Sequence, residues 1–201
     1  MTKHREQTIE SILEAAKKKF VEHGYEGISI QEIAKEAKVN VAMVSYYFNG
    51  KENLYYEIFK KYGLSKDLPN FLEKNQCNPL HALRDYLTIL ITHVIKHPEI
   101  GILSYYEIIR QSPRLETIKP HIIGIFEQLI EILTEGKKQG VFHFLSVNHT
   151  INWIISMVLV PKVQNFIGSI NPTESIDLKE DWTIADMSNN IIFSLRSATK
   201  M

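Results

Sequence analysis

The chain has 201 residues and 44% of them are hydrophobic, which supplies enough apolar side chains for a packed core and excludes a largely disordered protein. Its 23 Lys and Arg residues balance its 23 Asp and Glu residues, so the charge excludes a strongly basic, non-specific binder of polyanions but not a locally basic surface. The single cysteine, Cys77, excludes an intramolecular disulfide framework and a multi-cysteine zinc site.

The first predicted helix covers residues 6–23. Its apolar residues lie three or four positions apart and form one helical stripe: Ile9, Ile12, Leu13, Ala16 and Phe20. Gly24 follows at the position where a left-handed backbone ends a helix at little cost. Lys3, His4 and Arg5 are expected to form a short basic arm before this helix.

Three helix-start signals follow closely. Ser29, with Glu32 three residues later, has the pattern of a capping box, and Asn40 is a capping residue before the next apolar run. Asn49 and Glu52 repeat the capping-box pattern. The sequence therefore predicts three short helices in succession, at the spacing of a tri-helical DNA-binding unit.

Longer apolar stripes at helical spacing occupy the rest of the chain. They predict helices over residues 79–97, 99–110, 114–140, 148–167 and 183–197. Pro120 is expected to start or kink the third of these helices, Asn148 to cap the fourth, and Pro161 to bend or end it. The polar residues 168–181 predict a loop.

The fold class that follows is all-α. We expect an N-terminal three-helix helix-turn-helix DNA-binding domain over residues 1–62 and a larger helical domain over residues 63–201. The most apolar stretch of the C-terminal half, Ile151 to Val160, is far shorter than the roughly 20 residues that span a bilayer. The charged N-terminus has no apolar segment after it, so we expect a cytoplasmic protein without a signal peptide or membrane contact.

The second helix of a helix-turn-helix enters the DNA major groove. Residues 41–48 must bury Val44 and Phe48 against the preceding helices. The opposite side then offers Val41, Ala42, Ser45 and Tyr46, with Met43 at its edge. Small side chains at the tip permit close approach to base edges and contact with a thymine methyl, whereas hydroxyls donate to phosphates. Lys51 adds a cation beside the amides of the next helix N-terminus.

This stretch resembles the TetR family of transcriptional regulators over about the first 60 residues. The matching residues are Ile33-Ala34, Ala37-Lys38-Val39, Tyr47-Phe48 and Lys51-Glu52-Asn53-Leu54. By that resemblance, Val41, Ala42 and Met43 lie at base edges. The positions that the resemblance assigns to phosphate contacts are Ser29, Ile30, Ser45, Tyr46, Tyr47 and Lys51.

Two residues depart from the family pattern. Lys38 stands at the turn position where the family usually has glycine, and a left-handed lysine costs about 1 kcal/mol. Ser45 replaces a common tyrosine and shortens one phosphate contact. These departures and the zero net charge support an alternative function, a helical small-molecule-binding adaptor with a degenerate helix-turn-helix and no operator.

For the second domain the resemblance implies effector binding and dimerisation through the last two long helices. The dimer-interface candidates are Ile154, Val158, Ile184, Met187, Ile191 and Leu195. The effector-pocket candidates are Tyr86, His93, Tyr105, Tyr106, Phe126, Trp153 and Met157. Both sets have a simpler alternative, because apolar and aromatic residues at helical spacing also fill a protein's own core.

The function predicted is a ligand-responsive repressor that binds a pseudo-palindromic operator in double-stranded DNA as a homodimer, with an unknown small-molecule effector. An enzyme is not expected. Cys77 lies in a polar turn beside Pro79, and no Gly-rich phosphate loop is present. His93 and His97 have a metal-ligand spacing of i and i+4, but no third ligand accompanies them. We therefore predict no catalytic residues, no metal and no cofactor.

Overall fold

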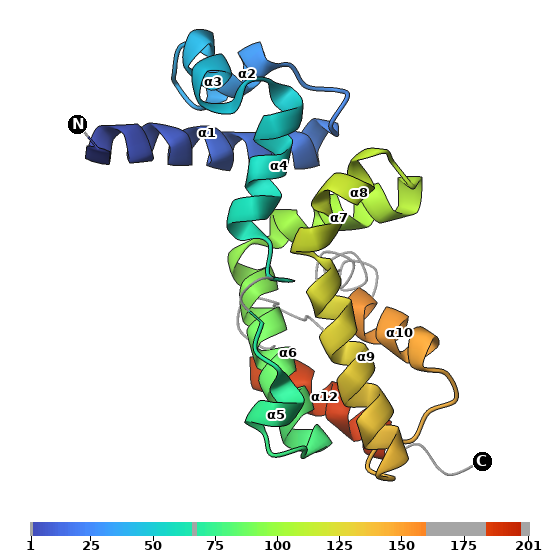
Figure 1. Ribbon diagram of the computed structural model, residues 1–201. Helices are drawn as coiled ribbons and strands as arrows, with labels where there is room; N and C mark the ends of the chain where they lie inside the picture. The colour runs from blue at the N-terminus through green and yellow to red at the C-terminus, as the bar shows by residue number, and fades with distance from the viewer. Residues whose placement is uncertain (1, 66–67, 160–183, 198–201) are drawn as a thin grey trace, which may run out of the picture. The chain divides into compact units, whose positions relative to one another are not determined.

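The computed structural model describes residues 2–65, 68–159 and 184–197, which form helices and loops (Figure 1). The all-α prediction is confirmed over these residues. Pro161 and the loop expected at residues 168–181 lie outside the described part of the chain. None of the described helices is long and apolar enough to cross a membrane.

The chain divides into two compact units. The N-terminal unit joins residues up to Gly63 with residues 97–122, and the C-terminal unit joins residues 64–96 with those from Ile123 onward. This grouping differs from the single division expected after residue 62. The reason is long-range packing, since apolar residues of the 97–122 segment are buried with the first four helices.

The N-terminal unit contains six α-helices and a short 3₁₀ turn among its described residues. Their bounds are α1 (Thr2–His23), α2 (Ile30–Glu36), α3 (Val41–Phe48), α4 (Lys51–Tyr62), α7 (Pro98–Arg110), α8 (Arg114–Ile118) and η2 (Lys119–His121). Lys3, His4 and Arg5 lie within the first turns of α1, so the basic arm expected before this helix is instead helical. Gly24 ends α1 with a φ of 73°, as its position predicts.

Two of the three helix-start predictions are confirmed. The Ser29 amide donates to the Glu32 carboxylate at 2.9 Å, while the Glu32 amide donates to the Ser29 hydroxyl at 3.3 Å, which completes the capping box of α2. The Asn40 side chain accepts from the Ala42 amide at 2.8 Å and caps α3. These bonds satisfy backbone donors that the first helical turn leaves unpaired.

The third prediction is wrong. Asn49 ends α3 in a left-handed conformation with a φ of 52° and does not begin α4. The N-cap of α4 is Gly50, whose φ of 117° suits glycine and whose missing side chain makes no capping bond. Asn49 and Gly50 are the only residues between α3 and α4. Because Asn49 ends α3, the N-cap position of α4 falls to Gly50.

The core of the N-terminal unit is formed by α1 to α4 together with α7 and the segment after it. Its buried residues include Ile12, Phe20, Ile33, Val44, Leu54, Phe59, Leu103 and Ile118. Helices α2 and α3, which form the helix-turn-helix, follow α1 in the chain, and α4 crosses α1 (Figure 1). This packing fixes one side of α3 and leaves its other side at the surface.

The described residues of the C-terminal unit form five helices: α5 (Phe71–Lys74), α6 (Pro79–Lys96), α9 (Ile123–Lys138), α10 (Val147–Leu159) and α12 (Ile184–Ser197). The continuous helix expected from residue 114 to 140 is broken by the Pro120 turn into α8, η2 and α9. The short helix α5 was not predicted. Helix α10 begins before Asn148, and the Ser146 hydroxyl accepts from the His149 amide at 3.4 Å in place of the predicted cap.

Helix α6 is central to the C-terminal unit, where it packs against α9, α10 and α12. Tyr86 on α6 is fully buried, and its hydroxyl donates to the Ile125 carbonyl at 2.9 Å. The buried core also includes Leu83, Leu87, Leu90, Leu129, Ile132, Leu133, Ile154, Val158, Ile191 and Leu195.

Candidate nucleic-acid interface

Helix α3 is anchored on one side. Val44 is completely buried and Phe48 is 3% exposed. Before the helix, Lys38 adopts the predicted left-handed conformation with a φ of 56°, and the Val39 amide donates to the Ala34 carbonyl at 3.0 Å. The tight turn between α2 and α3 therefore forms in spite of the lysine, because these backbone bonds and the buried residues fix it.

The other side of α3 is at the surface. Tyr46 is 81% exposed and Val41 is 40% exposed, while Ala42 and Ser45 are also exposed. Met43 is half-buried, as expected for the edge of the helix face. The geometric part of the prediction is confirmed: α3 presents two small side chains, a hydroxyl and a tyrosine outward, and its apolar side holds it in place.

The predicted phosphate-contact residues lie at the start of α2, on α3 and at the start of α4. Ser29 uses its hydroxyl within the capping box, where it donates to the Glu32 carboxylate at 2.6 Å. Ile30 is half-buried against the core. Tyr47 is half-buried, with its ring centroid 5.1 Å from that of Tyr46.

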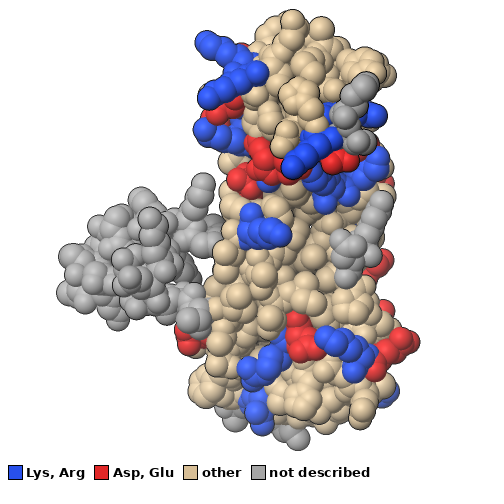
Figure 2. All heavy atoms as spheres, turned by 90° about the vertical axis from the view of Figure 1, so that its left-hand side faces the viewer, with Lys and Arg blue, Asp and Glu red and all other residues tan. Residues whose placement is uncertain are grey.

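Cationic side chains occur on α1, α2 and α4 and in the turn before α3. The Arg5 guanidinium carbon lies 5.9 Å from the centroid of the Tyr47 ring, and the Lys51 ammonium lies 4.5 Å from the centroid of Tyr25. Lys35 and Lys38 are exposed. Figure 2 shows Lys and Arg side chains on either side of an uncharged surface in the part of the view where α2 and α3 lie, with Asp and Glu side chains among and below them. Cations at the edges of an uncharged surface can contact phosphates while apolar side chains approach the bases.

The predicted effector-pocket residues belong to different units. Tyr105 and Tyr106 lie on α7 in the N-terminal unit and are 44% and 43% exposed. The C-terminal unit contains Tyr86, His93, Phe126, Trp153 and Met157. Tyr86 packs edge-on against Phe71 in the core with its hydroxyl bonded to backbone, so the structure favours the core alternative for this residue. The other side chains of the set are half-buried or exposed.

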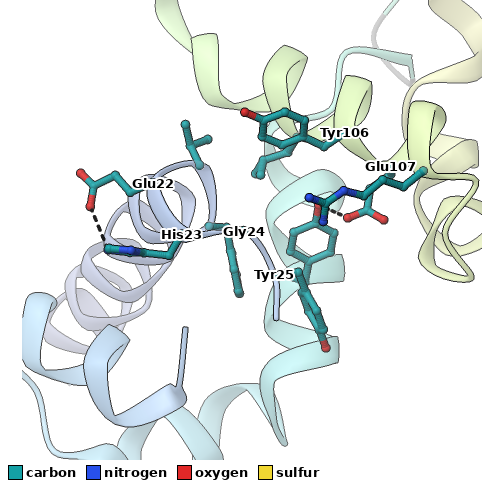
Figure 3. Close-up of a pocket in the computed structure, with 11 residues that line it drawn as sticks. Glu22, His23, Gly24, Tyr25, Tyr106 and Glu107 are labelled. Carbon is teal, nitrogen blue, oxygen red and sulfur yellow. Dashed lines mark hydrogen bonds and ion pairs between the residues drawn. The ribbon is translucent and has the colours of Figure 1, made fainter. Parts of the chain in front are cut away.

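One cavity of the N-terminal unit has a volume of about 190 Å³ (Figure 3). Tyr106 and Glu107 of α7 line it together with Tyr25, and at the end of α1 the His23 ring faces Glu22 at 3.6 Å. The volume is smaller than the roughly 300 Å³ or more of pockets that enclose drug-sized ligands. The sequence pattern indicated Tyr106 but gave no sign of Tyr25 or Glu107, whose proximity depends on tertiary packing.

A buried carboxylate lies beside this cavity. The side chain of Glu107 is 5% exposed and accepts hydrogen bonds from the hydroxyls of Tyr55, at 2.9 Å, and Ser112. Arg114 pairs with it, with Nε 3.4 Å from the carboxylate. Burial, and then the negative charge of Glu107, raise the pKa of Tyr55 well above its usual value, so this phenol remains a donor at neutral pH.

The predicted dimer-interface residues require a correction. Ile154, Val158, Ile191 and Leu195 are all at most 3% exposed, because α10 and α12 turn these stripes toward the core of their own protomer. Ile184 and Met187 are half-buried against the same core. The four buried side chains therefore stabilise the C-terminal unit, which is the alternative that the helical spacing had left open, whereas the dimer contact of Ile184 and Met187 stays a prediction.

Three large apolar side chains are exposed on the C-terminal unit. Leu145 is 84% exposed, Phe193 is 69% exposed and Trp153 is 38% exposed. Leu145 and Trp153 line one shallow groove together with Phe144 and Ser194. The sequence pattern missed Phe193 and Leu145 because they are not part of any regular stripe.

The sequence and the fold both match those of known regulators. A family model described as bacterial regulatory proteins of the tetR family matches residues 12–58. The probable HTH-type transcriptional regulator YttP of Bacillus subtilis (strain 168) is 30% identical over 165 residues, which are 78% of this chain and 78% of the relative. The chain belongs to the TetR family.

Two further relatives of this chain are also transcriptional regulators. The crystal structure of HlyIIR, a hemolysin II transcriptional regulator, is 64% identical, with a TM-score of 0.81 over 96% of this chain and 99% of that one. The HTH-type transcriptional repressor NicS of Pseudomonas putida (strain KT2440) is 27% identical over 160 residues, which are 76% of this chain and 74% of the relative. The protein is a DNA-binding transcriptional regulator, and these relatives do not favour the adaptor without an operator.

Proposed function

We propose that this TetR-family regulator represses transcription as a homodimer bound to a pseudo-palindromic operator, and that a small-molecule effector releases it. The single observation that carries the proposal is the two-sided geometry of α3. Val44 and Phe48 anchor the helix, while Val41, Ala42 and Tyr46 face outward. In a helix-turn-helix this outward side is the one that enters the major groove.

The proposed contacts divide into two kinds. Val41, Ala42 and Met43 are assigned to base edges, where small or flexible apolar side chains discriminate through contacts such as the thymine methyl. The assignment to phosphates covers Ser29, Ile30, Ser45, Tyr46, Tyr47 and Lys51. Because the capping box occupies both the hydroxyl and the amide of Ser29, Ser29 is proposed to act by ordering the start of α2, and Ile30 through its own backbone amide.

The proposed dimer contact consists of the exposed apolar side chains Leu145, Trp153 and Phe193. Leu145 and Trp153 line one groove, and apolar side chains gathered in this way often mark a contact with a partner. A second copy of the chain is the occupant that suits a pseudo-palindromic site, because a two-fold axis pairs the same surface on both subunits. The operator is chromosomal DNA, so we place the protein in the cytoplasm.

Repression of transcription and its relief by the effector are explained by a shift in the populations of two dimer arrangements. An effector that binds one arrangement of the dimer better than the other changes the spacing of the two α3 helices and lowers operator affinity. HlyIIR is described as a hemolysin II transcriptional regulator and NicS as a repressor, which supports both the sign of regulation and the choice of DNA to test.

The test is an anisotropy titration of the full-length protein against overlapping fragments of a hemolysin II promoter and of the chain's own upstream region. We expect one fragment to bind at least about tenfold more tightly than scrambled DNA of equal length. Binding should weaken as salt rises, because phosphate contacts release counterions. Equal affinity for all fragments at every salt concentration would refute operator binding.

A further inference from the structure

We propose that Tyr25 is a positioning residue of the DNA interface. It holds the Lys51 ammonium ready for a DNA phosphate, and it is held in turn by Arg114 of α8 and Glu107 of α7. All four residues belong to the N-terminal unit. This inference rests on the proposed function, in which Lys51 contacts the operator.

The first contact is between Lys51 and Tyr25. The Lys51 ammonium lies 4.5 Å from the centroid of the Tyr25 ring, within the range of an energetically significant cation–π contact. Lys51 is the first residue of α4 and is half-buried, so part of its flexible stem is already ordered. The ring face attracts the charge without accepting a conventional hydrogen bond, which leaves the ammonium able to donate to a phosphate oxygen.

The position of Tyr25 is fixed by its neighbours. Its ring stacks near Phe20, with centroids 5.6 Å apart, and meets Tyr55 edge-on at 5.1 Å. The Arg114 guanidinium carbon lies 4.0 Å from the Tyr25 centroid. One aromatic ring therefore contacts both a cation of α4 and a cation of α8.

The buried carboxylate completes the arrangement. Glu107 pairs with Arg114 and accepts from the Tyr55 hydroxyl, so it orients two of the groups that contact Tyr25. Tyr25 and Glu107 both line the cavity in Figure 3. Arg114 also pairs with Glu26, next to Tyr25 in the chain, at 3.1 Å. A shift of α7 or α8 would change the contacts around Tyr25 and hence the order of Lys51.

The physical effect is preorganisation. A free lysine side chain loses rotamer freedom when it binds a phosphate, and this loss weakens binding. A lysine that an aromatic ring already holds loses less. The predicted signature is energetic coupling between Tyr25 and Lys51 in operator binding, with no such coupling for a residue that only maintains the fold.

The experiment compares wild type, Tyr25→Leu, Lys51→Met and the double variant in operator titrations over a series of salt concentrations, with Tyr25→Phe as the matched control that keeps the ring. We expect Tyr25→Leu to weaken binding about three- to tenfold. In the Lys51→Met background the same change should cost less than about twofold. In each single variant, the slope of the logarithm of the binding constant against the logarithm of the salt concentration should decrease in magnitude. The decrease should correspond to at most about one phosphate contact.

A second variant, Arg114→Lys, keeps the test decisive if Tyr25→Leu does not fold, because it retains a cation beside the buried Glu107 but removes the planar guanidinium from the Tyr25 ring. It should weaken wild-type binding about two- to threefold and have no effect once Lys51 is methionine. Equal losses in both backgrounds, with wild-type operator binding intact, would overturn the inference and leave the proposed function standing. A wild type that shows no operator preference would refute the proposed function itself.

Discussion

Helix α3 in the N-terminal unit and helix α12 in the C-terminal unit use the same amphipathic pattern in different ways. Each buries an apolar stripe in its own unit, with Val44 and Phe48 in α3 and Ile191 and Leu195 in α12. Their outer sides differ, since α3 exposes Ala42, Ser45 and Tyr46 whereas α12 exposes Phe193. The comparison separates two roles: the buried stripe stabilises each unit, and the residues outside the stripe are the ones that we propose contact DNA or a second copy of the chain.

The largest effect is expected from the anchoring side of α3. Phe48→Ala should lower the free energy of unfolding by about 3–5 kcal/mol, because it removes a buried aromatic ring and leaves a cavity. Operator binding should fall with the folded fraction. Urea unfolding followed by circular dichroism measures the change, with Tyr46→Ala on the exposed side as control. Equal stability of the two variants would contradict the anchoring assignment.

A charge on the outer side of α12 should break the dimer and not the fold. Phe193→Glu is expected to weaken dimerisation at least about tenfold, since it places a carboxylate in a surface proposed to be covered by a second copy. Sedimentation velocity over a concentration series measures it. Thr134→Glu, at an exposed position of α9 that does not line the Leu145–Trp153 groove, is the matched control. An unchanged dimer would exclude this surface.

Tyr46, the exposed tyrosine of α3, tests whether the outer side of this helix contacts DNA. Tyr46→Ala should weaken operator binding about tenfold for all sequences, with no measurable change in unfolding, because the side chain is 81% exposed. Tyr46→Phe separates loss of the hydroxyl from loss of the ring. If Tyr46→Ala binds the operator as tightly as wild type, the groove-facing side of α3 has been assigned wrongly.

The smallest effect should come from the tip of α3. Ala42→Gly removes one exposed methyl group and should relax the preference at a single base pair by about two- to fivefold. Competition with operators substituted at each position measures the preference. A uniform loss at every position would assign Ala42 to helix stability rather than to base contact.

Local signals in the sequence predicted the parts of the fold that local chemistry decides. The capping box of Ser29 and the cap at Asn40 depend on neighbours within three residues, and both form as predicted. Asn49 was misassigned because the end of α3 and the start of α4 compete for the same two residues. Pro120 predicted where the helix expected over residues 114–140 would be interrupted, but it did not predict that the interruption would divide the segment into α8, η2 and α9.

Contacts between residues that are distant in the chain could not be predicted from the sequence. No periodicity relates Tyr25, Lys51 and Arg114, which come from a turn and two helices distant in the chain. Helical spacing also could not show whether the stripes of α10 and α12 face a partner or their own core, since both use the same pattern. The exposed residues Leu145 and Phe193 became visible only once the core was known.

The membership of α7 and α8 in the N-terminal unit has a practical consequence for protein engineering. A chimera that grafted only the first 62 residues onto a foreign sensor would lose Leu103 and Ile118, and it would leave the apolar side chains of α1 to α4 that they cover open to water. A transferable module would have to carry the 97–122 segment as well, which means splicing two discontinuous pieces of the chain.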